Sequence, residues 1–285
     1  MLIVSTKNCI NTTIEITDAI GAHMIMTEVK RFPDGELYVR LSESVEDMDV
    51  IAVGNTREDG EALEFMLLLN ALRENGAKKI TAFIPYFGYA RQHMIYKPGE
   101  AISSKMFTET LSRYSDEIVA INIHDNFTMK YSDKKFRVLS MVKGIADYFS
   151  PAHIGIVVAP DDGAMEIAKE AAGYLNVEAK HLDKKRIDSV TVNYLEAKFD
   201  VNNKNVLIID DIISTGGTVK KSIKILKAMG ANKVYVGAIH GIFINNSGDD
   251  ISGICDDLAV TDTIYSRYSK IKISEVIGET LKELA

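Results

Sequence analysis

Two stretches of this sequence follow one pattern, which constrains the fold more than any other feature. They are VIAVGNTREDGEALEFMLLLNALRENGAKKI at Val50–Ile80 and VLIIDDIISTGGTVKKSIKILKAMGANKV at Val206–Val234. Each contains an apolar run, a polar turn, a helical stretch, the spacing L-x-x-x-G-A-x-K and a second apolar run, and they align when two residues are dropped from the turn. Gly76 and Gly230 stand where a helix C-terminus needs a left-handed residue. Any two βαβ units share this outline, but the common Gly-Ala-x-Lys spacing favours two related α/β halves.

Short apolar runs alternate with helical stretches along most of the chain, which predicts a largely parallel sheet flanked by helices in each half. Near-continuous apolar runs suit strands that are covered on both faces. The candidate strands are Leu2–Ser5, Val50–Gly54, Ile80–Pro85, Ile118–Ile123, Ile154–Ala159, Val206–Asp210 and Val234–Ile239. Apolar residues at helical spacing predict the buried helix faces; these are Ala62, Phe65, Met66, Leu69, Leu72, Val219, Ile223, Leu226 and Met229.

The length of 285 residues suits two domains, each with its own core. We expect one domain at residues 1–147 and a second at 148–285, because a helical segment at Val138–Phe149 is followed by Ser-Pro. The final helix, 273–284, could pack on the N-terminal domain. Only the second repeat carries an acidic, glycine-rich turn, so we expect binding to be divided between the halves.

The composition disfavours several classes of function. The net charge is −7, so the field of the whole chain repels nucleic acid and acidic membrane surfaces. Cys9 and Cys255 are the two cysteines, and neither lies in a CxxC motif or a Cys/His cluster, which fits a reducing compartment. No leader pattern and no apolar stretch of membrane-spanning length is apparent. We therefore expect a cytoplasmic protein that binds neither nucleic acid nor membrane.

The sharpest local signal is VLIIDDIISTGGT at Val206–Thr218, where an apolar run ends in two carboxylates and a Ser-Thr-Gly-Gly-Thr turn opens a helix. Ligands of open parallel sheets bind at the carboxyl ends of the strands. The glycines let backbone N–H groups face an anion, and the helix dipole favours phosphate there. The alternative is an acidic strand end before an ordinary N-capped helix. The lysine of a Walker A loop is missing.

This turn resembles the ribose-phosphate loop of the phosphoribosyltransferase fold, which implies two phosphoribosyltransferase-like domains. The resemblance implies that Asp210 and Asp211 hold the ribose hydroxyls. It also implies that the 5-phosphate is bound by Ser214, Thr215, Gly216, Gly217 and Thr218. The motif specifies the superfamily and leaves the reaction open.

Two segments resemble the ribose-phosphate diphosphokinase family and imply an ATP site. RFPDGE at Arg31–Glu36 has a turn signal between extended runs, which predicts a hairpin near 31–41. In the family this hairpin reaches toward the nucleotide site of a neighbouring subunit, which implies a homo-oligomer of at least two chains. PYFGYARQ at Pro85–Gln92 is the second segment. The implied ATP-binding residues are Phe32, Asp34, Gly35, Glu36, Arg91 and Gln92. From the residues alone, Phe32 could equally fill the core, and the role of His93 stays open.

Metal ligands and catalytic cations are also implied by the resemblance. His124 in INIHDN and Asp161 in VVAPDDGA match the family's magnesium ligands, whereas Asn122 replaces a common aspartate and its role stays open. Lys184 and Arg186, in AKHLDKKRID, match the family's catalytic loop, and Arg186 is also implied at the ribose 5-phosphate. A charged cluster in a loop is otherwise usually solvated surface.

The resemblance implies a magnesium-dependent enzyme of nucleotide biosynthesis that transfers the diphosphoryl group of ATP to the anomeric hydroxyl of ribose 5-phosphate. The first alternative is a phosphoribosyltransferase, which would share the 210–218 turn but has no reason to carry RFPDGE, ARQ or the Lys-x-Arg pair. The second is a non-catalytic, nucleotide-binding regulatory relative, which would be expected to lack the cations. The sequence leaves oligomer size, allosteric control, cation preference and nucleotide selectivity open.

Overall fold

The computed structural model describes residues 1–182, 184–186, 192–194 and 199–283, with residues 184–186 and 192–194 described by their backbone. The chain divides into two compact units, Met1–Ser140 together with the C-terminal segment from Ile273, and Met141–Lys272. The boundary between the two units follows Ser140, whereas the sequence predicts it after residue 147. None of the helices described in the two units is both long and apolar enough to cross a bilayer.

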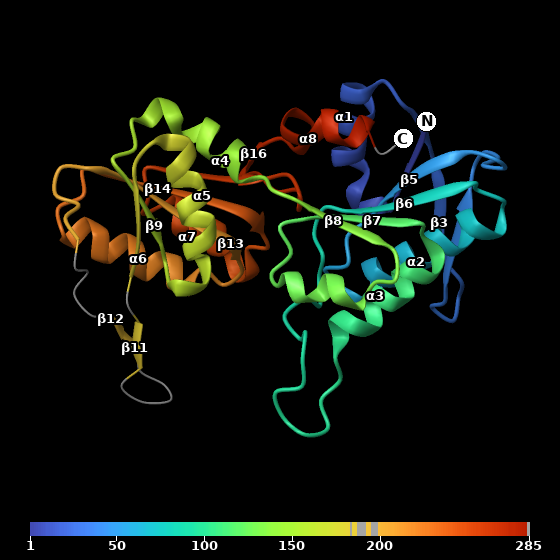
Figure 1. The fold of residues 1–285 in the computed structure, drawn as a ribbon, viewed down its shortest axis with the longest axis horizontal. Helices are drawn as coiled ribbons and strands as arrows, with labels where there is room; N and C mark the ends of the chain where they lie inside the picture. Colours follow the sequence, from blue (N-terminus) through green and yellow to red (C-terminus); the bar gives the residue numbers. More distant parts are fainter. Residues whose placement is uncertain (183, 187–191, 195–198, 284–285) are drawn as a thin grey trace. The chain divides into compact units, whose positions relative to one another are not determined.

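The first unit is built on a six-stranded parallel sheet in the order β2-β1-β5-β6-β7-β8 (Figure 1). The strands are β1 (Leu2–Ser5), β2 (His23–Ile25), β5 (Asp49–Val53), β6 (Lys79–Ile84), β7 (Glu117–Ile121) and β8 (Lys135–Leu139). The accompanying helices are α1 (Ile10–Ile20), α2 (Asp59–Glu74), α3 (Ser103–Tyr114) and α8 (Ile273–Lys282). Helix α8 packs on α1, where a Cβ on Gly278 would lie 4.0 Å from the Cβ of Ala19.

The second unit has its own six-stranded parallel sheet, in the order β10-β9-β13-β14-β15-β16. The strands are β9 (Ile156–Ala159), β10 (Glu178–His181), β13 (Asn205–Ile213), β14 (Lys233–Gly241), β15 (Asp257–Thr261) and β16 (Ser269–Ile271). The helices are α4 (Val142–Phe149), α5 (Met165–Leu175), α6 (Gly217–Ala228) and α7 (Ser247–Ser252). Helix α6 buries Val219, Ile223 and Leu226, as its apolar spacing predicts.

The two sheets share one topology, which confirms the repeat seen in the sequence. In each, the first strand lies between the second and the third, and the third to the sixth follow in order. Gly76 and Gly230 have φ values of 79° and 89°, as the helix ends require. An aspartate is also repeated: Asp116 accepts a hydrogen bond from the Ile80 N–H, and Asp256 accepts one from the Val234 N–H, both at 2.8 Å.

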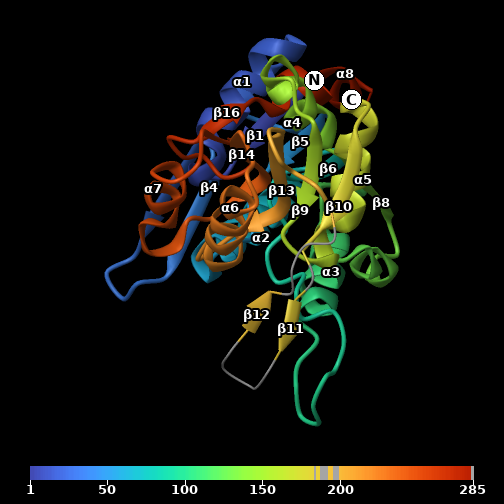
Figure 2. The same cartoon turned by 90° about the vertical axis from the view of Figure 1, so that its left-hand side faces the viewer.

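Two short antiparallel hairpins lie outside the sheets. The first, β3 (Thr27–Arg31) and β4 (Leu37–Leu41), is the one that Pro-Asp-Gly predicts. The second, β11 (Lys184–Arg186) and β12 (Val192–Tyr194), projects away from the second sheet in Figure 1 and Figure 2. The sequence predicts a polar loop at residues 184–186, whereas their backbone pairs with β12 in a ladder.

The helix predicted at Val138–Phe149 is too long at its N-terminal end. Val138 and Leu139 belong to β8, where they pair with Ala120 and Ile121 of β7, and α4 begins at Val142. The prediction was wrong there because a helical apolar period and a short apolar strand look alike over a few residues.

Candidate active site

The glycine-rich turn of the second unit is anchored through its carbonyl groups. The Ile213 carbonyl accepts a hydrogen bond from the Ile242 N–H at 2.9 Å, and the Ser214 carbonyl accepts one from the Ser247 hydroxyl at 2.7 Å. Gly216 has a φ of 68°, and a Cβ there would lie 2.7 Å from the Ile251 side chain. Both its conformation and its close approach to α7 therefore require glycine.

The N–H groups of the same turn are left available. Among the described residues, the N–H groups of residues 215–218 donate no hydrogen bond to another residue, as expected at the start of a helix. Thr215 and Gly217 are exposed, while Ser214 and Thr218 are half-buried. Amide donors, threonine hydroxyls and the positive end of α6 thus gather in one turn, an arrangement that suits a phosphate group.

Three carboxylates gather near the carboxyl ends of β9 and β13. Asp161 follows β9 and accepts a hydrogen bond from the Gly163 N–H at 3.1 Å, and Asp210 and Asp211 lie near the end of β13. Burial, followed by the charge of Asp211, a hydrogen bond with it and the charge of Asp161, raises the pKa of Asp210 well above its ordinary value. Within the described residues, no group of three or more His, Cys, Asp or Glu side chains is arranged to hold a metal ion.

The corresponding turn of the first unit is closed by its own chain. Asn55 and Thr56 follow β5 and are buried. The Asn55 side-chain carbonyl accepts a hydrogen bond from the Tyr86 N–H at 2.8 Å, and the Thr56 hydroxyl accepts one from the Gly88 N–H at 2.8 Å. A Cβ on Gly88 would lie 2.0 Å from the Thr56 carbonyl oxygen, so the two segments touch through their backbones.

The hairpin tip carries the predicted ATP-binding residues on its surface. Phe32 is 45% exposed and meets Tyr38 edge to face at 5.7 Å between ring centroids, so it does not fill the core. Gly35 has a φ of 96°, and the Asp34 carboxylate accepts a hydrogen bond from the Glu36 N–H at 3.2 Å. Asp34, Gly35 and Glu36 are exposed, which leaves this tip accessible on the unit to which it belongs.

Arg91 and Gln92 begin the long connection from β6 to α3. Arg91 is exposed and makes no ion pair or hydrogen bond with a described residue. The Gln92 side chain donates to the Met94 carbonyl at 3.0 Å and to Glu100 Oε2 at 3.1 Å. Glu100 is a residue that the sequence did not single out, because its partner lies at the other end of a loop.

His124, the predicted metal ligand of the first unit, is exposed just after β7. Asn122 has a φ of 37°, a left-handed conformation that asparagine adopts more readily than most residues. The neighbouring Asp125 pairs with His93, at 3.2 Å between Oδ2 and Nε2, and the Tyr131 hydroxyl donates to the His93 carbonyl at 2.7 Å. His93 therefore ties the connection after Gln92 to the segment after His124.

The predicted catalytic cations lie in the hairpin of the second unit. The backbones of Lys184 and Arg186 belong to β11, and their side chains lie outside the described residues.

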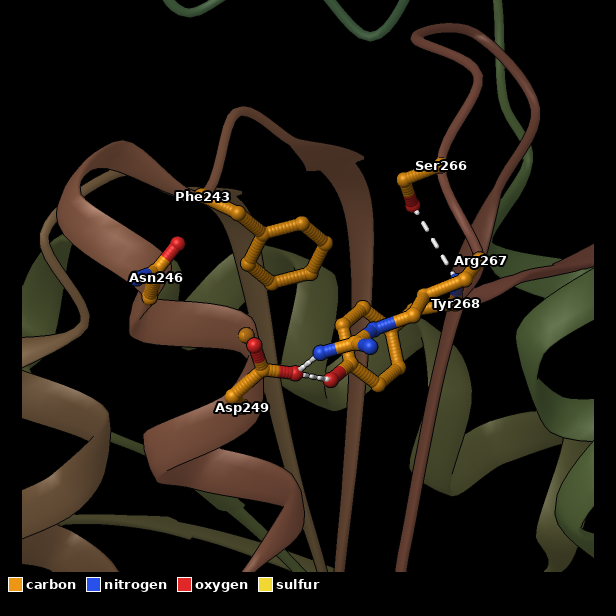
Figure 3. A pocket seen from close by; sticks show the side chains of 7 residues that line it. Phe243, Asn246, Asp249, Ser266, Arg267 and Tyr268 are labelled. Carbon is orange, nitrogen blue, oxygen red and sulfur yellow. Dashed lines mark hydrogen bonds and ion pairs between the residues drawn. The ribbon is translucent and has the colours of Figure 1, made fainter.

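Each unit also has a pocket that contains none of the predicted site residues. In the second unit, a pocket of about 360 Å³ is lined by residues that include Phe243 and Tyr268 (Figure 3). The Asp249 carboxylate there forms an ion pair with Arg267 and accepts a hydrogen bond from the Tyr268 hydroxyl. In the first, a mainly apolar pocket of about 380 Å³ lies between α2 and α3.

Comparisons with known proteins relate the whole chain to one family. Residues 1–114 match the model for the N-terminal domain of ribose phosphate pyrophosphokinase, and residues 137–252 match the model for the phosphoribosyl transferase domain. A ribose-phosphate pyrophosphokinase of Thermoplasma acidophilum is 42% identical over 263 residues, which are 92% of each chain. One of Thermoplasma volcanium is 38% identical over 284 residues, 100% of this chain and 99% of the other.

A solved structure has the same fold along nearly the whole chain. It is the phosphoribosylpyrophosphate synthetase from Mycobacterium smegmatis, which matches with a TM-score of 0.89 at 22% identity and covers 99% of this chain and 98% of that one. Two matching domain models and close relatives of equal length together establish that this chain belongs to the ribose-phosphate pyrophosphokinase family.

Proposed function

We propose that this chain transfers the diphosphoryl group of ATP to the anomeric hydroxyl of ribose 5-phosphate, releasing AMP and giving phosphoribosyl diphosphate. The hydroxyl oxygen attacks the β-phosphorus, the bond from that phosphorus to the α-phosphate oxygen breaks, and the hydroxyl proton is lost. The observation that carries the proposal is the open turn at residues 214–218, in which the N–H groups of residues 215–218 donate no hydrogen bond within the described chain. Membership of the family supports the reaction.

We assign the sugar phosphate to the second unit. The 5-phosphate would accept hydrogen bonds from the N–H and hydroxyl groups of Ser214, Thr215, Gly216, Gly217 and Thr218. Carboxylates repel phosphate but accept hydrogen bonds from hydroxyl groups, so Asp210 and Asp211 suit the ribose hydroxyls.

We assign the nucleotide to residues of the first-unit surface. Phe32 offers an exposed ring for stacking on adenine, and Arg91 offers a planar donor fork for phosphate or a base. Asp34, Gly35, Glu36 and Gln92 complete the proposed set. As the family resemblance implies, and because Phe32 is exposed at the hairpin tip, we further propose that the tip serves a neighbouring copy. Sedimentation equilibrium of an active monomer would contradict a shared site.

Magnesium is the proposed metal. The oxygen donors of Asp161, Asp210 and Asp211 are of the kind that this hard cation prefers. The pKa of Asp210 is raised first by burial and then by the charges of Asp211 and Asp161, and a cation nearby would offset that negative charge. Asp161 in the second unit and His124 in the first are the proposed protein ligands. Bound magnesium would neutralise diphosphate charge, while Lys184 and Arg186 would stabilise the charge that develops on the transferring group. Arg186 is also proposed at the ribose 5-phosphate. The free thiols Cys9 and Cys255 support the proposed cytoplasmic location.

The deciding experiment mixes the purified protein with ATP, magnesium and ribose 5-phosphate and follows AMP. We expect AMP to appear only when both the sugar phosphate and magnesium are present, with one phosphoribosyl diphosphate formed for each AMP. Consumption of phosphoribosyl diphosphate with a purine or pyrimidine base, and no AMP from ATP, would identify a phosphoribosyltransferase instead. Nucleotide binding without turnover in either assay would identify a regulatory relative.

A further inference from the structure

One carboxylate organises the connection that follows Gln92. Glu100 Oε2 accepts hydrogen bonds from the Tyr96 N–H at 2.8 Å, the Lys97 N–H at 2.9 Å and Gln92 Nε2 at 3.1 Å. These bonds lower the pKa of Glu100, first through the two backbone donors, so it is ionised at neutral pH. The carboxylate therefore closes the loop from residue 92 to residue 100.

The same carboxylate and the Met94 carbonyl together determine which way the Gln92 amide is turned. Both partners of Nε2, Glu100 Oε2 and the Met94 carbonyl oxygen, are acceptors, so only the NH₂ group of the amide can satisfy them. Its two hydrogens are used there. Gln92 Oε1 accepts no hydrogen bond from a described residue, and the Gln92 backbone is held by the Ser104 N–H, which donates to its carbonyl at 3.3 Å. The side chain thus presents an acceptor and no free donor.

We propose that Glu100 is a positioning residue that leaves the Gln92 amide oxygen free to accept a hydrogen bond from the nucleobase, and so favours bases that carry an exocyclic amine. This inference rests on the proposed placement of the nucleotide at Arg91 and Gln92. The 6-amino group of adenine is a donor and would pair with Gln92 Oε1, whereas a 6-oxo purine presents an acceptor at the same position. Two facing acceptors repel and leave both groups unpaired, which is how a polar site rejects a near-isostere.

Replacing Glu100 separates this role from mere support of the loop. In Glu100→Ala the Met94 carbonyl alone still favours the present orientation, so the Gln92 amide turns over more readily and offers its NH₂ group, and the 6-oxo base of ITP is accepted better relative to ATP. In Glu100→Gln an oxygen remains that can accept the same N–H donors, so the orientation of Gln92 is kept. Glu109→Ala, which removes an exposed carboxylate from α3, is the matched control.

The measurement is the ratio of kcat/KM for ATP to kcat/KM for ITP, at saturating ribose 5-phosphate and magnesium. Wild type is expected to prefer ATP, Glu100→Ala to lower the ratio by about tenfold, and Glu100→Gln and Glu109→Ala to stay within about threefold of wild type. The ratio of the dissociation constants for ITP and ATP, measured by calorimetry without the sugar phosphate, should change in the same way.

Three results would overturn the inference: equal use of ATP and ITP by wild type, an unchanged ratio in Glu100→Ala, or a loss in Glu100→Gln as large as in Glu100→Ala. A loosened loop would weaken both nucleotides alike and so leave the ratio unchanged. A wild-type protein that released no AMP would instead refute the proposed function, and the binding ratio would still test Glu100.

Discussion

The turns that follow β5 and β13 occupy the same place in two sheets of identical order, yet one is closed and the other is open. In the first unit, Asn55 and Thr56 use their side chains to bind the backbone at Tyr86 and Gly88. In the second, the carbonyl groups are anchored and the N–H groups of residues 215–218 are left without a described partner. A repeated fold can therefore close a turn in one copy and leave its N–H groups open in the other, where we propose that the sugar phosphate binds.

The ends of β5 and β13 also differ in charge. The aligned repeats place Gly54 and Asn55, which are uncharged, opposite Asp210 and Asp211. Closing the first turn satisfies its buried polar groups and contributes stability. Keeping two carboxylates at the second concentrates negative charge, which a ligand or cation would relieve. Substitutions in the two units can test this division between a structural turn and a proposed binding turn.

The largest effect is expected from Lys184, which lies in the β11–β12 hairpin of the second unit. Lys184→Ala should lower kcat by about a hundred- to a thousandfold, because a cation aimed at developing charge is worth a few kcal/mol, while ribose 5-phosphate still binds. Steady-state kinetics and calorimetry check this, with Lys185→Ala as the control, because the family resemblance assigns Lys185 no role. Unchanged turnover would remove Lys184 from the mechanism.

A smaller loss is expected when the open turn itself is distorted. Gly216→Val puts a branched side chain at a φ of 68° and against Ile251, which should cost about 2 kcal/mol or roughly thirtyfold in ribose 5-phosphate affinity. Calorimetry measures the affinity. Gly60→Ala, whose Cβ would meet only Arg31 at 3.6 Å, is the control. Binding as tight as in wild type would show that the turn does not hold the phosphate.

Matched threonine substitutions should have opposite consequences in the two turns. Thr56→Ala leaves the buried Gly88 N–H unpaired and should lower the free energy of unfolding by about 1–2 kcal/mol, with ribose 5-phosphate affinity unchanged. Thr215→Ala removes an exposed hydroxyl and should weaken that affinity by about three- to tenfold, with stability within about 0.5 kcal/mol of wild type. Denaturant unfolding and calorimetry on both proteins test the pair, and the reverse pattern would refute the comparison.

The smallest effect concerns the charge at Asp210. Because its pKa is raised in the folded protein, the folded state binds more protons than the unfolded one, and stability falls as pH rises from about 4 through the folded pKa. Asp210→Asn should therefore raise the free energy of unfolding by about 1 kcal/mol at pH 8, while it weakens ribose binding. The stability difference should shrink toward zero at pH 4, and a difference that stayed constant with pH would exclude a charge effect.

The parts of this fold and site that depend on residues close together in the sequence could be predicted from it. The repeat could be recognised because Gly76 and Gly230 end equivalent helices. The open turn could be recognised because its carboxylates and glycines lie close together in the sequence. Polar edge strands such as β10, whose sequence is EAKH, were missed because their conformation is imposed by pairing with a buried neighbour. The spacing of residues does not encode such pairing.

Contacts between distant parts of the chain were also out of reach. The closing of the first turn by Tyr86 and Gly88 requires the segment after β6 to return to the end of β5. The hydrogen bond between Gln92 and Glu100 depends on the path of the loop that separates them. The pairing of His93 with Asp125 joins two different loops. Nothing in the sequence indicates these contacts, because each depends on where a distant partner lies in the fold.

The most direct test of the account is a titration of the isotope-labelled protein with ribose 5-phosphate, followed through its backbone amide resonances. The account predicts large, saturable shifts at Thr215, Gly216, Gly217 and Thr218, and little change at Asn55 and Thr56. Shifts centred on the turn after β5, or none at residues 215–218 when the sugar phosphate is bound, would contradict it.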